Sequence, residues 1–252
     1  MLEILHQVDA RFAAYDAAEI SSEIDACEDM YVPGPPEHLD HYLQVGRDAI
    51  ALIARAMVMT GGTQFDSVLD MPCGGGRVTR HLVRFFPDAR IWVADANPEK
   101  AQAVVDRFGA TALLNFDPGF HRPPGRRFGL IFVGSLLTHL DEAAFGRCLS
   151  WLIDATDRDG MLIATTHGRK LEHLRAAGRW DYPDDRWSQL RSGYDGRGFG
   201  FFAGEGEIGM TMCKPSWLAR QIEGDSSLRF IFADAAWVDA QDALIIHKRP
   251  LT

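Results

Sequence analysis

Apolar positions in the first sixty residues recur at the three- and four-residue spacing of helices. The first such face is formed by Leu5, Val8, Phe12 and Tyr15. The YVPGPP stretch at 31–36 then interrupts regular structure, because proline and glycine do not continue a helix. A second apolar face follows at Leu43, Ile50, Ile53, Ala54 and Met57. Residues 1–60 are therefore predicted to be a helical extension packed on a core domain formed by residues 61–252.

From residue 67 onward, short apolar runs alternate with helical periods. The runs predicted to be strands are 67–70, 90–95, 111–116, 128–135, 160–167, 229–234 and 242–248. Asn97 and Pro98 mark one helix start, since asparagine is a good N-cap and proline suits the first helical position. Strands alternating with helices predict an α/β protein whose sheet is parallel and covered on both faces.

The segment 180–207 breaks this rhythm. It is rich in glycine, aspartate and aromatic residues and has no helical period. Its length exceeds the ~12–15 residues usual for a connection, which favours a functional loop. We predict a lid insertion there, with Trp187, Tyr194 and Phe199 as walls of a substrate pocket. Alternatively, these aromatic residues form a small core of the loop itself.

Composition narrows the class of partner. The net charge is −9, from 26 basic and 35 acidic residues, which argues against nucleic acid as the main partner. The four cysteines are too dispersed for a CxxC metal site, and reduced thiols favour a cytoplasmic protein. No signal peptide, membrane-spanning run or metal-ligand cluster is expected. The oligomeric state stays open.

The stretch VLDMPCGGGRVTRHL at 68–82 places three glycines between a strand and a helix. A phosphate-binding P-loop would need a Lys-Ser/Thr pair where Arg77 and Val78 stand. A dinucleotide site would need a third glycine where Thr79 stands. A nucleoside ligand without pyrophosphate remains. Asp95, which ends the next strand, is suited to accept both ribose hydroxyls. Alternatively, it is an acidic residue that complements the dipole of a helix start.

These motifs together resemble class I S-adenosylmethionine-dependent methyltransferases. VLDMPCGGGRV resembles the first motif of that family, IWVADANPEK the second, and FGLIFVGSLLTHLDEAAF its fourth-strand region. The order and spacing match over residues 40–250, and the nearest resemblance is to bacterial stand-alone enzymes with SLLTHL and an ending such as WVDAQD. The resemblance implies a Rossmann-like, seven-stranded, mostly parallel sheet with helices on both faces and an antiparallel last strand. It also implies S-adenosyl-L-methionine as cofactor and a small-molecule or glycan acceptor methylated on oxygen or nitrogen.

The resemblance also implies roles for individual residues. The Gly74–Gly76 backbone borders the methionine part of the cofactor, and Asp70 orients the loop and the cofactor's amino group. Asp95 binds the ribose, and Pro72 and Ala96 also belong to the cofactor-binding residues. The other implied cofactor residues are Asp117 near the adenine (with Asn115 and Phe116 as rivals), Ser135 and Leu136 beside the methionine moiety, and Tyr42 and Arg47 at its carboxylate. Arg47 equally suits a solvated helix face. Pro72 and Gly129 depart from the family, which usually has a glycine and an acid at these places.

Methyl transfer requires alignment of the acceptor with the methyl group, and a base only when the nucleophile must lose a proton. His139 is the candidate base. Alternatively, it caps or packs the helix start at Asp141. His167 is a weaker candidate. Two rival functions remain: a non-catalytic adenosyl-ligand-binding protein and a nicotinamide-dependent oxidoreductase.

Overall fold

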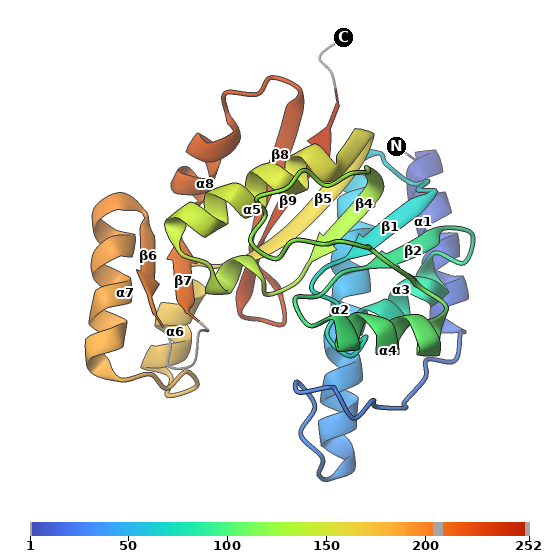
Figure 1. Ribbon diagram of the computed structural model, residues 1–252, viewed down its shortest axis with the longest axis horizontal. Coiled ribbons are helices and arrows are strands. Elements are labelled where there is room, and N and C mark those ends of the chain that lie inside the picture. The colour runs from blue at the N-terminus through green and yellow to red at the C-terminus, as the bar shows by residue number, and fades with distance from the viewer. Residues whose placement is uncertain (1, 204–208, 250–252) are drawn as a thin grey trace. The chain divides into compact units, whose positions relative to one another are not determined.

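The computed structural model describes residues 2–203 and 209–249, and its main feature is a seven-stranded sheet (Figure 1). The strand order is β3-β2-β1-β4-β5-β9-β8. The bounds are β1 Ser67–Asp70, β2 Arg90–Val93, β3 Thr111–Ala112, β4 Phe128–Val133, β5 Thr156–His167, β8 Leu228–Trp237 and β9 Gln241–Lys248. β1 is parallel to β2 and β4, and β2 is parallel to β3. β9, the last strand of the chain, is antiparallel to β5 and β8. The predicted α/β sheet with an antiparallel last strand is confirmed.

The chain divides into two compact units. The first comprises Met1–Pro118 and Arg126–Phe132, and the second comprises Gly119–Gly125 and Val133–Thr252. The predicted division at residue 60, between an extension and a core domain, stays a prediction.

The first unit contains four helices. They are α1 Leu2–Asp16, α2 Pro36–Thr60, α3 Thr79–Phe85 and α4 Pro98–Phe108. α1 and α2 are the two helices predicted from periodicity, and they lie side by side (Figure 1). All five apolar positions predicted for the second helix face are buried. Residues 17–35, here called the strap, connect the two helices without regular structure.

A close approach at Gly46 sets α2 against the loop that follows β1. A Cβ on Gly46 would lie 2.1 Å from Cδ2 of His81 and 2.6 Å from the carbonyl oxygen of Arg77. His81 is buried, and its Nδ1 is 2.7 Å from the hydroxyl oxygen of Tyr15 in α1. α1, α2 and the glycine-rich loop therefore depend on one another for their positions.

The second unit contains a second, two-stranded sheet in addition to its strands of the main sheet. Its elements besides β5, β8 and β9 are η1 Leu137–His139, α5 Glu142–Ala155, α6 Lys170–Ala176, α7 Asp184–Arg197, β6 Phe199–Phe202, β7 Met210–Cys213 and α8 Pro215–Ile222. β6 and β7 pair antiparallel.

The prediction that 180–207 is a loop is wrong, because α7 and β6 occupy most of it. α7 buries only Leu190 and Tyr194, so it has little apolar periodicity to detect. A Cβ on Gly200 would lie 1.9 Å from the carbonyl oxygen of Leu190, so glycine is needed for close packing there and not as a flexible joint. Residues 204–207 of the predicted lid lie outside the described residues.

The predicted strand 111–116 is also wrong beyond Ala112. Leu113 still donates its N–H to the carbonyl of Val93, at 2.8 Å. Leu114 is then 80 % exposed, and Asn115 adopts a φ of 58° that ends the strand. The apolar residues after Ala112 led to the prediction of a longer strand, but the chain forms a turn there.

Two helix glycines offer a matched test of the packing at α2. Gly46→Ala should lower the free energy of unfolding by about 1–3 kcal/mol, because the added methyl group overpacks against His81 and Arg77. Gly146→Ala, in α5, meets nothing within 4 Å and should raise it by about 0.5–1 kcal/mol. Urea unfolding of both variants measures the difference. Equal effects of the two substitutions would contradict the close approach.

Candidate functional site

The loop between β1 and α3 is held by its own backbone N–H groups. Cys73 donates to the carbonyl of Ala94 at 3.0 Å, and Gly76 donates to the carbonyl of Cys73 at 2.9 Å. Gly74 donates to Oδ2 of Asp95 at 2.9 Å, and Gly75 donates to Oε2 of Glu28 at 3.1 Å. Each N–H from 73 to 76 therefore has a partner within the chain.

The three glycines of this loop serve different purposes. A Cβ on Gly76, whose φ is 87°, would lie 2.4 Å from Cε2 of Phe108 in α4. A Cβ on Gly75 would lie 2.7 Å from the Cβ of Glu28. At Gly74 the nearest atom is Oε2 of Glu28, 3.9 Å away. Only Gly74 thus borders open space where a ligand can approach the backbone.

Asp95 is fixed in orientation by two hydrogen bonds and keeps accepting capacity. Oδ2 accepts from the N–H of Gly74, and Oδ1 accepts from the N–H of Asn97 at 2.9 Å. A carboxylate has about four lone-pair positions, so each oxygen can accept one more hydrogen bond. The side chain of Asn97 caps α4 by accepting from Glu99 N at 2.9 Å, as predicted. Because the helix has this cap, the binding interpretation of Asp95 is favoured over that of a helix-start acid.

Asp70 links the two ends of the glycine-rich loop. Its side chain is 1 % exposed, and Oδ2 accepts the hydroxyl hydrogen bond of Thr79 at 2.6 Å. Burial raises the pKa of Asp70 to about 7 against the opposing Thr79 hydrogen bond, and the nearby charge of Asp95 raises it further. Asp70 therefore ties the end of β1 to the first residue of α3, and its predicted contact with the cofactor's amino group stays a prediction.

Two side chains from the N-terminal part of the first unit reach the loop. Glu28, in the strap, binds Gly75, and Tyr42 in α2 donates its hydroxyl to the same Glu28 oxygen at 2.6 Å. The sequence did not point to Glu28, because the strap has no periodicity that would place it.

Arg47 is exposed, and its charge acts on Tyr15 and His81. Arg47 follows Tyr42 by five residues, about 140° around the helix, so the two side chains point to different sides.

The remaining cofactor positions predicted in the first unit lie near these loops. Pro72 is half-buried and follows a cis peptide bond, and Ala96 is exposed directly after Asp95. Past β3, Asn115 is exposed, whereas Phe116 and Asp117 are half-buried. Their roles stay predictions.

Ser135 and Leu136 belong to the second unit and follow β4. Ser135 has a φ of 60° and donates its N–H to Oγ1 of Thr165 at 2.8 Å. Gln241 donates to Oγ of Ser135 at 2.8 Å and accepts from Thr165 at 2.5 Å. This three-residue network holds Ser135 in its unusual conformation. Thr165 and Gln241 were missed, although Gln241 lies in the WVDAQD ending. Leu136 is half-buried beside it, and both cofactor roles stay predictions.

His139 is oriented with one ring nitrogen engaged. Its Nδ1 lies 2.8 Å from the carbonyl oxygen of Gly209, and since a carbonyl only accepts, Nδ1 carries the proton and Nε2 is left as an acceptor. It does not cap the next helix, because Asp141 caps α5 by accepting from Ala144 N at 2.8 Å. His167 is buried, and burial together with the charge of His139 lowers its pKa to about 3. As a base, His139 is therefore better suited than His167.

The aromatic residues predicted to bind substrate lie mostly inside the second unit. Phe199 is 0 % exposed and packs on Phe145 and Trp217, with ring centroids 5.7 and 4.6 Å away. Tyr194 is 6 % exposed and belongs to a buried cluster against which the half-buried Trp187 packs. The structure therefore places Tyr194 and Phe199 in a small core of this region, as in the alternative interpretation, and the substrate roles stay predictions.

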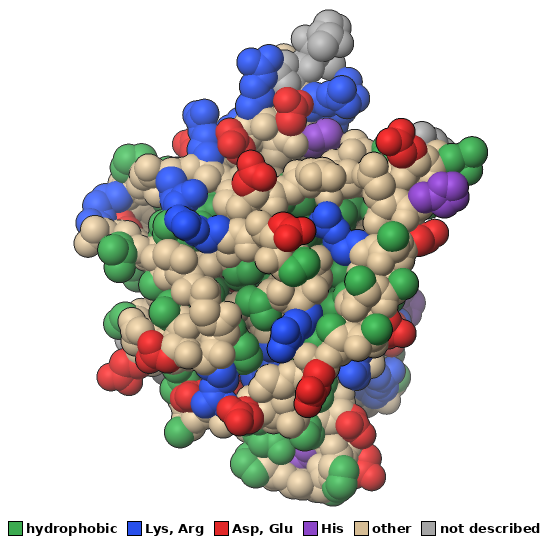
Figure 2. All heavy atoms as spheres, turned by 90° about the vertical axis from the view of Figure 1, so that its right-hand side faces the viewer, with side chains coloured by type: hydrophobic (Ala, Val, Ile, Leu, Met, Phe, Trp, Pro, Cys, Tyr) green, Lys and Arg blue, Asp and Glu red, His purple; other side chains and the backbone are tan. Residues whose placement is uncertain are grey.

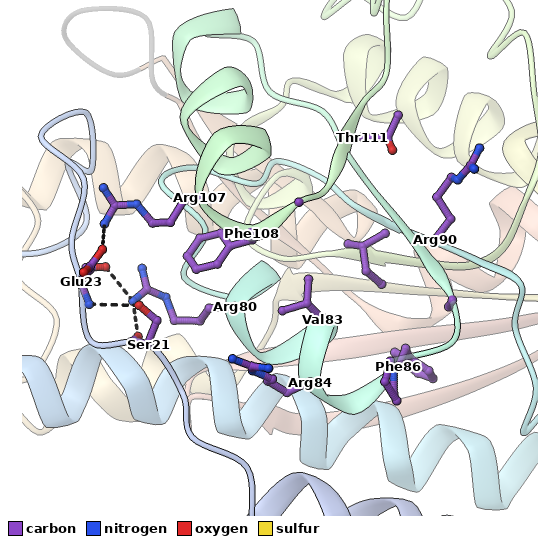
Figure 3. Close-up of a pocket in the computed structure, with 14 residues that line it drawn as sticks. Ser21, Glu23, Arg80, Val83, Arg84, Phe86, Arg90, Arg107, Phe108 and Thr111 are labelled. Carbon is purple, nitrogen blue, oxygen red and sulfur yellow. Dashed lines mark hydrogen bonds and ion pairs between the residues drawn. The ribbon is translucent and has the colours of Figure 1, made fainter.

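A hollow of about 800 Å³ in the first unit lies away from this loop. It is lined by residues that include Arg84, Arg90, Arg107 and Phe108 (Figure 3). Arg90 begins β2, whereas Asp95 follows the other end of that strand. The hollow therefore lies at the opposite end of the strands from Asp95. The candidate site is formed by Asp95 and the loop between β1 and α3.

Other site types were searched within the described residues. In 2–203 and 209–249, no group of three or more His, Cys, Asp or Glu side chains could hold a metal ion. No helix there is long and apolar enough to cross a membrane. On the face shown in Figure 2, basic and acidic side chains are intermixed.

Comparisons with known proteins agree with this arrangement. No protein-family model matches the chain. One curated relative, malonyl-[acyl-carrier protein] O-methyltransferase 1 of Ilyobacter polytropus, is 23 % identical over 133 residues, which is 52 % of this chain and about half (48 %) of that relative. An S-adenosylmethionine-dependent methyltransferase from Clostridium acetobutylicum superposes with a TM-score of 0.58 at 14 % identity, over 81 % of this chain and 92 % of that one. The chain has the class I methyltransferase fold.

Two further solved structures share this methyltransferase fold. A sugar N-methyltransferase from Streptoalloteichus has a TM-score of 0.57 at 15 % identity and covers 93 % of this chain and 98 % of its own. The 1,6-didemethyltoxoflavin-N1-methyltransferase of Burkholderia thailandensis, solved with its acceptor and S-adenosylhomocysteine, has a TM-score of 0.53 at 16 % identity and covers 90 % and 98 %.

The raised pKa of Asp70 predicts a pH-dependent stability. Because its folded-state pKa of about 7 lies above the ordinary 3.8, folding favours the protonated form, and stability is lost as pH rises between these values. Asp70→Asn stays uncharged and should not show this loss. Its free energy of unfolding should exceed that of the wild type increasingly between pH 5 and pH 8, by roughly 2–4 kcal/mol at the upper end. Urea unfolding across this range checks it, and a difference that does not change with pH would disprove the assignment.

Proposed function

We propose that the protein is an S-adenosyl-L-methionine-dependent methyltransferase that methylates an oxygen or nitrogen of a small molecule or glycan. The observation that carries this proposal is the pairing of Gly74 with Asp95. Oδ2 of Asp95 accepts from Gly74, which is the glycine of the triplet that borders open space. Both oxygens of Asp95 can still accept one more hydrogen bond each. The methyltransferase fold supports the same ligand.

The same loop argues against a nicotinamide dinucleotide. Pyrophosphate binds free N–H groups at a loop or helix N-terminus. Here the N–H groups of Gly74 and Gly76 already donate to Asp95 and to the carbonyl of Cys73. An adenosyl ligand without pyrophosphate needs only the ribose contacts of Asp95 and the open side of Gly74.

The chain's own residues would hold the cofactor and position the acceptor. Asp95 would accept the ribose hydroxyls, and Gly74 would allow close approach, while Asp70 and Thr79 keep the loop in place. When bound, S-adenosylmethionine supplies an activated methyl group on a neutral leaving group. For a hydroxyl acceptor, Nε2 of His139 would take the proton, and the carbonyl of Gly209 would steady the ring through Nδ1.

A small acceptor is favoured over nucleic acid by the acidic net charge of −9 and by the intermixed charges on the face shown in Figure 2. The solved structures of this fold include enzymes for a sugar nitrogen and for a heterocyclic nitrogen. Calorimetric titration with S-adenosylmethionine, S-adenosylhomocysteine and NAD, in the presence of a chelator, tests the ligand. Labelled methyl donor with fractionated cell extract then tests transfer. Binding without any transfer would favour the non-catalytic alternative, and preference for NAD would refute the proposal.

Asp95→Asn is the direct test of the ribose contact. The amide keeps one oxygen for Gly74 but loses the charge that strengthens hydrogen bonds to hydroxyls, so the dissociation constant for S-adenosylhomocysteine should rise about tenfold to a few hundredfold. Asp106→Asn, on α4 and hydrogen-bonded to Gln102, removes the same charge elsewhere and should leave affinity unchanged. Unchanged binding by Asp95→Asn would show that the carboxylate only supports the loop.

His139→Gln separates proton transfer from binding. With a hydroxyl acceptor, kcat should fall by about a hundredfold or more, because the proposed acceptor of its proton, Nε2 of His139, is removed. Affinity for S-adenosylhomocysteine should not change. The control is His173→Gln, an exposed histidine in α6, which should keep full activity. Full activity of His139→Gln would remove the base from the mechanism.

A further inference from the structure

The strap is an acidic segment held against basic side chains of the first unit. Residues 17–35 contain five acidic residues and no lysine or arginine. Arg80 donates to the carbonyls of Ser21 and Glu23 at 2.7 and 3.0 Å (Figure 3). Further along the strap, Asp25 pairs with Arg107 at 3.0 Å and Asp29 pairs with Lys100 at 2.6 Å.

Glu28 differs from the other acidic residues of the strap because it reaches the glycine-rich loop. Glu28 is buried, whereas the side chain of Asp29 beside it is 68 % exposed. Oε2 accepts from both the N–H of Gly75 and the hydroxyl of Tyr42, and Oε1 accepts from Met30 N at 2.8 Å. The loop thus already binds a carboxylate, one residue along from Gly74.

Positive charge completes the surroundings of this carboxylate. The guanidinium carbons of Arg77 and Arg80 lie 5.9 and 5.1 Å from the centre of the Tyr42 ring. The charge of Glu28 acts on both arginines. Arg80 is occupied by the strap carbonyls, but the guanidinium of Arg77 has no hydrogen bond or ion pair within the described part of the chain. An N–H, a hydroxyl and a cation in one place recognise a carboxylate.

We propose that Glu28 competes with the carboxylate at the amino-acid end of the ligand for the N–H of Gly75, the hydroxyl of Tyr42 and the charge of Arg77, so that the ligand binds only by replacing Glu28. The inference rests on the proposed function, since S-adenosylmethionine and S-adenosylhomocysteine carry such a carboxylate. When the carboxylate of the ligand replaces that of Glu28, Gly75 N–H and the Tyr42 hydroxyl keep a hydrogen-bond acceptor. Neither donor is left unsatisfied in a buried place.

The strap can release Glu28 at small cost in apolar burial. Met30 and Val32, which follow it, are 59 % and 66 % exposed. The ring of Tyr31 packs on that of Tyr42, with centroids 5.6 Å apart, but this contact does not involve Glu28. The upstream contacts of Ser21 and Glu23 with Arg80 do not involve Glu28 and can persist. While Glu28 occupies the site, the apparent affinity for the ligand falls in proportion to the fraction of molecules that are open.

Removing the competing carboxylate is the test. If Glu28 occupies the site about nine-tenths of the time, Glu28→Ala should bind S-adenosylhomocysteine about tenfold more tightly than the wild type. Methylthioadenosine, which has the adenosine part but no carboxylate, should bind equally to both proteins. Glu19→Ala is the matched control, because Glu19 is an exposed strap acid with no hydrogen bond or ion pair among the described residues.

Each other outcome overturns the proposal in a distinguishable way. Unchanged or weaker binding of S-adenosylhomocysteine by Glu28→Ala, with methylthioadenosine still bound, would refute it alone. The weaker result would make Glu28 a ligand contact instead of a competitor. If the wild type binds neither compound, the proposed function fails and this inference fails with it.

Cys27 provides a second readout that needs no variant. Burial, with a contribution from Asp25, raises the pKa of its thiol to about 11, which makes it slow to alkylate while the strap is closed. The other three cysteines are buried. S-adenosylhomocysteine should accelerate alkylation of Cys27 by iodoacetamide, located by mass spectrometry, and methylthioadenosine should not. Protection of Cys27 by S-adenosylhomocysteine would show that the strap closes over the ligand and would refute the exchange.

Discussion

The hydrogen bond from the N–H of Gly74 to Asp95 is the interaction on which the candidate site depends. It joins the loop after β1 to the residue after β2, so two neighbouring parallel strands present their ends as one surface. A second bond to Asn97 fixes the other oxygen of the carboxylate. The two carboxylate oxygens of Asp95 are therefore oriented before a ligand binds, which reduces the entropy lost on binding.

Around this bond, the loop is kept in place by contacts that leave little room for variation. Gly76 admits Phe108 of α4, and Gly75 admits Glu28 of the strap. The glycine triplet thus mainly allows three parts of the first unit to pack together, and Gly74 alone of the three borders open space. A motif that resembles a binding loop can owe most of its glycines to its neighbours in the fold.

This division explains what the sequence could and could not predict. Strands such as 67–70 and the helix starting at Asn97-Pro98 carry local signals, namely apolar runs and caps, and they were predicted correctly. α7 was missed because a helix that buries only Leu190 and Tyr194 has almost no amphipathic period. Glu28, Thr165 and Gln241 were missed because their importance arises from contacts with residues 47, 30 and 106 positions away, which no local pattern encodes.

The network around Ser135 has a consequence for the order in which the protein becomes competent during synthesis. Ser135 is held by Gln241, which begins β9 and is synthesised 106 residues after it. β9 also pairs with both β5 and β8, so these two strands lack their shared neighbour until β9 has been synthesised. The first unit has all its helices by residue 108 and is completed by β4. The loop after β4 therefore reaches its final conformation only after β9 has been synthesised, which delays any activity that depends on this loop.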